Sequence, residues 1–148
     1  MKSMRWTAAA LAAFVLTGCS GVVSRVHQGR IGETINQNPD RRGFIEAIGI
    51  GASDPALPTE TQRKALSRDA AIVKAQYELL SMIKGVELEG GVTVSQAMEK
   101  DSLLAARVKN SIRGAEVLKS EFTADGGCVV TLRLPKYRLE EGLHWSLP

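Results

Sequence analysis

The longest regular pattern in this 148-residue chain is a run of apolar residues at helical spacing between Thr59 and Gly85. Apolar side chains recur three and four positions apart, which is typical of one face of an α-helix. The face comprises Leu66, Ala70, Val73, Tyr77 and Leu80, widened by Ile72, Leu79 and Ile83. Thr59 and Gln62 have the spacing of a capping box, and Gly85 follows Lys84 as a helix stop. The pattern predicts one long amphipathic helix whose apolar face meets the core.

A mostly buried strand is predicted before this helix, over residues 44–51. Both of its faces are apolar, with Phe44, Ile48 and Ile50 on one and Ile45 and Ala47 on the other. The Gly49-x-Gly51 spacing could open a nucleotide-binding fingerprint, but Asp54 stands where its third glycine would be. We therefore expect these glycines to permit a bulge or close packing of a helix against the strand.

Four further elements are predicted after the long helix: a strand, a shorter helix and the two strands of a hairpin. A strand broken at Gly90-Gly91 is indicated by apolar residues that alternate with polar ones: Val86, Leu88, Val92 and Val94. Asp101 or Ser102 would cap a shorter helix that ends at Gly114 and has Leu104, Val108 and Ile112 on one face. Residues 115–123 and 128–134 flank an Asp-Gly turn, which is typical of a β-hairpin, and Pro135 ends its second strand.

The resulting order β-α-β-α-β-β predicts an α+β fold. One long and one shorter helix would cover one face of a small, largely antiparallel sheet. About 100 residues from Gly43 onward suffice for a single modest core, so we assign residues 43–148 to one domain with a C-terminal tail.

Residues 1–18 have the parts of a secretory signal peptide. Lys2 and Arg5 precede an apolar stretch over residues 6–16, which is shorter than the roughly 20 residues needed to span a bilayer. The next residues, Leu16-Thr17-Gly18-Cys19, resemble the bacterial lipobox. This resemblance implies cleavage between Gly18 and Cys19, a diacylglycerol on the Cys19 thiol and an acyl chain on its new amine. The alternative is a plain signal peptide with an incidental cysteine.

Residues 19–42 are interpreted as the lipidated cysteine and a flexible tether. Residues 20–42 contain only five large apolar side chains, Val22, Val23, Val26, Ile31 and Ile35. Fully extended, the tether would span roughly 75 Å, so the domain could stand well away from its membrane. It could also dock on a partner.

Composition argues against nucleic-acid binding. Of the 19 basic residues, Lys2 and Arg5 would be removed with the leader. The processed chain would then have 17 basic and 16 acidic residues, which is close to neutral. The longest basic clusters, Arg41-Arg42 and Lys136-Tyr137-Arg138, are too short to follow a phosphate backbone and are interpreted as solvated surface. With Cys19 lipidated, Cys128 would have no disulfide partner and is expected to be a small buried thiol rather than a reactive one.

The sequence offers no constellation typical of catalysis or of a metal centre. The two histidines, His27 and His144, fall in the tether and in the tail, where nothing would preorganise them. The paired carboxylates at Glu87 with Glu89 and at Glu140 with Glu141 are interpreted as solvated surface. We therefore expect a non-enzymatic protein with no metal and no cofactor beyond the lipid.

Three segments together resemble a known family. These are the G-x-G strand, the alanine-rich helix RDAAIVKAQYELLSMIKGVEL and the terminal hairpin DGGCVVTLRL. They are similar to the small bacterial lipoproteins that include the flagellar outer-membrane lipoprotein P group. Family helices often place arginine where this chain has Gln76. The resemblance implies an outer-membrane lipoprotein facing the periplasm, with rings or a disk around the flagellar motor as its assembly. Ser20 after Cys19 resembles the outer-membrane sorting choice.

Two functions of different kinds remain open. The first is a structural protein of the cell envelope that associates with itself or with flagellar or other envelope proteins. Its candidate contacts are Leu139, Leu143, His144, Trp145 and Leu147, which have no predicted core role, although Trp145 could equally fold back onto the domain. The second is a binding module for a small lipid or glycan, using a pocket between helix and sheet.

Overall fold

The computed structural model describes residues 24–32, 43–88 and 90–143 of the chain. The predicted leader, Gly18, Cys19, His144, Trp145 and Leu147 lie outside the described residues. The described elements follow the order β1, β2, β3, α1, α2, α3, β4, β5 and α4. Helices and antiparallel strands are both present, so the predicted α+β class is confirmed.

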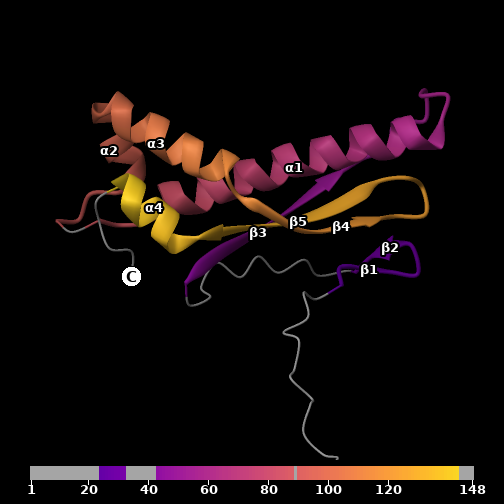
Figure 1. The fold of residues 1–148 in the computed structure, drawn as a ribbon, viewed down its shortest axis with the longest axis horizontal. Coiled ribbons are helices and arrows are strands. Elements are labelled where there is room, and N and C mark those ends of the chain that lie inside the picture. Colours follow the sequence, from indigo (N-terminus) through magenta and orange to yellow (C-terminus); the bar gives the residue numbers. More distant parts are fainter. Residues whose placement is uncertain (1–23, 33–42, 89, 144–148) are drawn as a thin grey trace, which may run out of the picture.

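Three antiparallel strands form the main sheet (Figure 1). The central strand is β5 (Cys128–Pro135), between β3 (Phe44–Gly51) and β4 (Glu116–Phe122). β3 pairs with β5 along its whole length, from Phe44 opposite Pro135 to Gly51 opposite Cys128. β4 and β5 form the predicted hairpin, with an irregularity in register between Val117 and Lys119. The predictions for the first strand and for the terminal hairpin are therefore confirmed.

The long helix α1 (Glu60–Lys84) crosses one face of the sheet and begins as predicted (Figure 1). Thr59 Oγ1 accepts a hydrogen bond from the Gln62 backbone N–H at 3.2 Å and donates one to Gln62 Oε1 at 3.0 Å. At the other end, the backbone N–H of Gly85 donates to the carbonyls of Ser81 and Met82. These bonds satisfy backbone groups that a helix end leaves without a partner.

Gly49 and Gly51 let α1 lie directly against β3. A Cβ atom on Gly49 would come within 1.9 Å of the Ala71 carbonyl oxygen. A Cβ on Gly51 would come within 1.9 Å of the Ser67 carbonyl oxygen. Both distances are far shorter than a van der Waals contact, so these positions require glycine. The expectation of close helix packing is confirmed.

The predicted apolar face of α1 is correct for Leu79 and Ile83, which are buried, but wrong for its N-terminal part. The residues that α1 buries are spaced four apart: Ser67, Ala71, Ala75, Leu79 and Ile83. Leu66, Val73 and Tyr77, which were expected to face the core, are 48%, 65% and 63% exposed. The reason is that Gly49 and Gly51 of β3 bring the strand close to Ser67, Ala71 and Ala75, and only small side chains fit in this narrow part of the interface.

The predicted strand over residues 86–94 is also wrong. Among the described residues of this segment, the only pairing is an isolated antiparallel bridge between Glu87 and Thr93. Val94 instead begins a short helix, α2 (Val94–Lys100), because Thr93 and Gln96 form a reciprocal capping box. The next helix, α3 (Ser102–Arg113), matches its prediction: Asp101 caps it, Gly114 ends it, and it buries Leu104, Val108 and Ile112.

The C-terminal segment after Pro135 forms a fourth helix, α4 (Lys136–Leu143), which packs against α3. Leu139 is only 1% exposed and belongs to the main core, so its expected role as a surface contact is wrong. Arg138 Nη1 donates to the Gly114 carbonyl at 2.7 Å and links this helix to the end of α3. Leu143 is the last residue of α4, and its side chain lies outside the described part.

Part of the predicted tether has a defined structure. β1 (Val26–His27) and β2 (Arg30–Ile31) form a small hairpin on the side of the sheet opposite α1 (Figure 1). The turn between them uses positive φ angles at Gln28 and Gly29. The Gly29 carbonyl accepts a hydrogen bond from the Ala124 backbone N–H at 2.8 Å. The expectation of a flexible tether therefore does not hold for residues 24–32.

Candidate functional site

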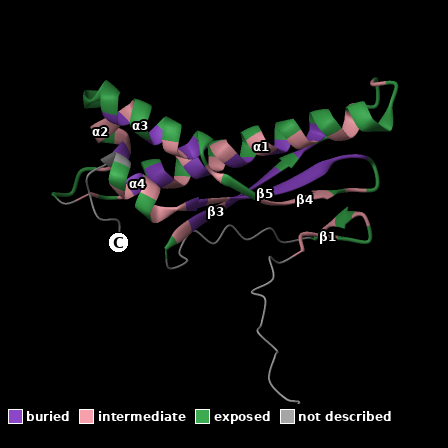
Figure 2. Cartoon of the chain, in the orientation of Figure 1, coloured by how far each residue is buried: buried purple, intermediate pink, exposed green. Residues whose placement is uncertain are grey.

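The most conspicuous surface feature of the domain is an uncovered apolar stripe along α1. We define the outer stripe as Leu66, Ala70, Val73 and Tyr77, all of which are exposed. Successive members lie four, three and four positions apart, so they follow one face of the helix. Figure 2 shows exposed positions along the side of α1 that faces away from the sheet.

The packing of α1 on the sheet explains why this stripe points outward. Each helical residue advances about 100° around the axis, so Val73 points away from both Ala71 and Ala75. Those two alanines are fully buried against the sheet. The outer stripe therefore lies on the opposite side of the helix from the sheet.

Charged side chains flank the outer stripe on both sides. Asp69 lies on one flank, and its side chain forms no ion pair within the described part of the chain. Lys74 lies on the other flank, where its Nζ contacts Glu78 Oε1 at 2.8 Å and lies 5.0 Å from the centre of the Tyr77 ring. The hydrogen bond and charge of Glu78 raise the pKa of Lys74. The surface is thus an apolar centre with polar margins, as in many interaction surfaces.

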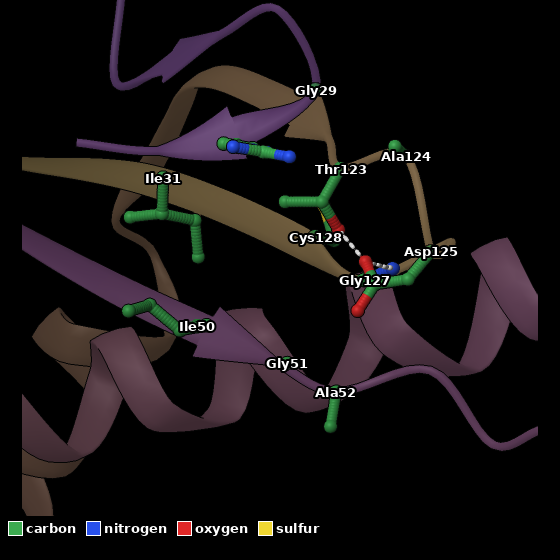
Figure 3. Close-up of a pocket in the computed structure, with 11 residues that line it drawn as sticks. Gly29, Ile31, Ile50, Gly51, Ala52, Thr123, Ala124, Asp125, Gly127 and Cys128 are labelled. Carbon is green, nitrogen blue, oxygen red and sulfur yellow. Dashed lines mark hydrogen bonds between the residues drawn. The ribbon is translucent and has the colours of Figure 1, made fainter.

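A second feature is an open hollow of about 510 Å³ between the β1–β2 hairpin and one end of the sheet (Figure 3). Its large apolar side chains are Ile31 and Ile50, and Ile50 is 46% exposed. The turn between β4 and β5 forms its polar edge, where the Thr123 hydroxyl and the Gly127 N–H both donate to Asp125 Oδ1. These bonds lower the pKa of Asp125.

This hollow differs from the pocket expected between helix and sheet. At Gly49 and Gly51 the backbones of β3 and α1 are in direct contact, at the helix–sheet interface where the pocket was expected. The hollow lies on the opposite side of the sheet and is shallow and open.

Glu121 fastens the β1–β2 hairpin to β4. Its carboxylate accepts hydrogen bonds from the Ser24 hydroxyl and from the Arg25 backbone N–H at 2.7 Å, and Lys119 Nζ lies 3.3 Å away. Burial raises the pKa of Glu121, but the hydrogen bonds from Ser24, Arg25 and Lys119 together outweigh burial, and the net effect lowers it. An ionised Glu121 therefore stabilises the docked hairpin.

Residues with catalytic potential are scattered in the described structure. His27 is exposed on β1, far in the sequence from other candidate groups. Cys128 is fully buried, and burial raises the pKa of its thiol, so it lacks the thiolate character of a reactive cysteine. No group of three or more potential metal ligands occurs among residues 24–32, 43–88 and 90–143.

The structure brings together few of the site residues predicted from sequence. Cys19, Trp145 and Leu147 lie outside the described residues, and Leu139 is part of the core. The sequence pattern identifies the outer stripe as apolar but predicts that it faces the core. The signal that distinguishes it is the row of small residues four apart, Ser67, Ala71 and Ala75, which follows the G-x-G strand.

The fold defines a small α+β domain, in which a three-stranded antiparallel sheet carries one long helix on one face. Comparisons with protein-family models, with curated proteins and with solved structures find no match to this chain. Within the described residues, no helix is both long and apolar enough to cross a membrane.

Proposed function

We propose that this protein is a lipid-anchored, non-enzymatic component of the bacterial outer membrane whose domain faces the periplasm and assembles with other envelope proteins. The observation that carries the assembly role is the outer stripe, in which Leu66, Val73 and Tyr77 are each about half or more exposed. Contiguous apolar surface of this kind is typical of interaction sites.

Membrane anchoring would make a modest interface sufficient. Chains that are confined to one membrane meet at a higher effective concentration than chains in solution, so weak contacts can assemble. The leader and the Leu16–Cys19 box support such an anchor. Each acyl chain on Cys19 would stabilise membrane binding by about 0.8 kcal/mol per buried methylene. The anchor and the stripe thus support the same role.

The similarity to the flagellar outer-membrane lipoprotein P group extends this proposal to the flagellar motor. In that case the protein would form part of a ring or disk, and its loss would impair swimming. Deletion of the gene followed by a swimming assay tests this extension, and unimpaired swimming would limit the proposal to a general envelope role.

The anchor and the assembly state are tested together on the full-length protein. The protein is extracted from its own envelope in mild detergent, and its mass and assembly state are compared with those of a Cys19→Ala variant. We expect lipid mass on the wild type, oligomers in the wild type, and a dispersed, unlipidated variant. An unmodified wild type would contradict the anchor, and a lipidated monomer would contradict the assembly role.

The alternative function is a binding module for a small lipid or glycan, and the hollow beside Ile31 and Ile50 is the observation that favours it. Replacing Ile50 with Trp would fill this hollow without disturbing the helix side of the sheet. Native mass spectrometry of the extracted protein would then show a bound small molecule in the wild type and its loss in the variant. Absence of any bound molecule from the wild type would count against this alternative.

A further inference from the structure

The spacing of the outer stripe matches the seam of a two-helix coiled coil. Alternating steps of four and three residues from Leu66 to Tyr77 are those of a and d positions in a heptad repeat. In this register Leu66 and Val73 occupy d positions, and Ala70 and Tyr77 occupy a positions. A second helix with the same stripe would therefore fit against α1, with side chains interlocking along the seam.

The flanking charges favour a second copy of this chain in parallel orientation. In the same register Asp69 occupies a g position and Lys74 the e position five residues later. Parallel helices bring each g residue beside the e residue five positions on in the partner, so Asp69 would meet the partner's Lys74 on both sides of the seam. Antiparallel helices would instead pair g with g and e with e, and these two opposite charges would not meet.

The surroundings of α1 leave room for such a partner. α2 and α3 pack near the C-terminal end of α1, where Leu80 is half-buried beside Met98 and Ala105. The part of α1 that carries the outer stripe extends beyond α3 in Figure 1. The sheet lies on the opposite side of the helix, so it does not obstruct the approach.

We infer that two copies of this protein pair through the outer stripes of their α1 helices, parallel and in register, with Asp69 of each beside Lys74 of the partner subunit. This inference rests on the assembly role proposed above and names its surface and partner. Pairing would redirect Lys74 from its contact with Glu78 within the same helix.

Parallel pairing is also compatible with two anchors in one membrane. A two-fold axis along the paired helices places equivalent atoms of both copies at the same height. In Figure 1 the β1–β2 hairpin, where the described chain begins at Ser24, lies across the sheet from the N-terminal half of α1. Both chains would therefore enter their domains from the same side of the dimer.

Charge reversal tests the pairing directly. Asp69→Lys would place two cations at each flank, and Lys74→Asp would place two anions there, so each variant alone should pair roughly tenfold more weakly. Mixing the two variants restores opposite charges at both flanks. We expect differently tagged full-length chains, co-expressed and extracted in mild detergent, to co-purify when the two variants are combined and far less when either variant is paired with itself.

A stripe variant with a matched control separates pairing from folding. Val73→Glu places a charge in the centre of the seam, whereas Leu103→Glu replaces a similarly exposed apolar residue, 60% exposed, on α3. Both should keep the wild-type circular dichroism spectrum. Only Val73→Glu should abolish co-purification.

Disulfide crosslinking distinguishes parallel from antiparallel pairing of the two α1 helices. In the parallel arrangement Val73 faces Val73 of the partner subunit, so a Val73→Cys variant should crosslink with itself. In an antiparallel pair, Val73 would instead face Ala70 of the partner subunit. A crosslink between an Ala70→Cys chain and a Val73→Cys chain would therefore overturn the inference. Oligomers that persist in Val73→Glu would also overturn it while leaving the assembly role intact. A monomeric wild type would overturn both.

Discussion

Gly49 and Gly51 set the distance between α1 and the sheet, because any side chain there would meet helix backbone rather than a movable side chain. A Cβ on Gly49 would lie 1.9 Å from the Ala71 oxygen and 2.4 Å from the Ala75 nitrogen. Backbone atoms in the middle of a helix cannot yield without moving the whole helix. The narrow gap then dictates small residues on the sheet side of α1, and thereby leaves the larger apolar residues outside.

We predict that Gly49→Ala lowers the free energy of unfolding by roughly 3 kcal/mol, because it overpacks the helix–strand contact. Gly32→Ala is the matched control, since a Cβ on Gly32 has no atom within 4 Å. This control should change stability by no more than about 0.5 kcal/mol. Urea unfolding followed by circular dichroism measures both. Equal effects of the two substitutions would contradict the packing argument.

Glu121 links the stability of the hairpin to pH. Its folded pKa is lowered, so its stabilising contribution is present above the unfolded pKa and is lost as the pH falls through the folded pKa. We predict that the wild type is more stable than Glu121→Gln by about 2 kcal/mol near neutral pH, since its carboxylate accepts charge-assisted hydrogen bonds. This difference should shrink below about pH 4.

The measurement is urea unfolding of both proteins across this pH range, with the Ala124 amide resonance as a local probe. The Ala124 N–H donates to the Gly29 carbonyl, so its chemical shift reports hairpin docking. A stability difference that does not vary with pH would show that the Glu121 charge is not responsible.

Among the helices and strands, those whose ends are set by interactions within a few residues are the ones that the sequence predicts correctly. Thr59 with Gln62, Asp101 and the Asp-Gly turn each act within a few residues, and the structure has the long helix, α3 and the hairpin where these signals place them. The capping box of Thr93 and Gln96 is an equally local signal for α2, but the apolar alternation around it suggested a strand.

The features that were not predicted depend on contacts between distant segments. Which face of α1 is buried depends on the glycines of β3, about 20 positions earlier in the chain. Likewise, the eight residues of α4 are too few to give a clear helical spacing of apolar residues, so the sequence does not predict this helix. Leu139 is buried because α4 packs against the core. The candidate surface could therefore be recognised as apolar from the sequence, but its exposure could not.

The burial of Leu139 makes α4 a part of the domain rather than a free tail. We predict that Leu139→Ala lowers the free energy of unfolding by about 3 kcal/mol through the cavity it leaves. Leu103→Ala removes the same atoms from an exposed position on α3 and should cost less than about 1 kcal/mol. Urea unfolding of the two variants compares them, and an equally small loss for both would show that α4 does not contribute to the core.

At the scale of the whole molecule, the docked hairpin determines how far the domain can stand from an anchored Cys19. Only residues 20–23 separate Cys19 from Ser24, so with the hairpin docked the described structure begins at most about 17 Å from the anchor. With the hairpin released, the chain from Cys19 to Gly43 could span about 80 Å. With Cys19 anchored as proposed, the hydrogen bonds of Glu121 would therefore hold the domain near the membrane surface.

We predict that the domain lies close to the membrane, with the N-terminal end of α1 nearer to it than α3. Energy transfer from a dye on Thr61→Cys to acceptor lipids should exceed that from a dye on Leu103→Cys, in the lipidated protein reconstituted into vesicles. Both sites are exposed, and Cys128 is buried and should not react with the dye. Adding Glu121→Gln should release the hairpin and lower the transfer from Thr61→Cys. Equal transfer from the two sites, unchanged by Glu121→Gln, would mean that the hairpin does not control the position of the domain.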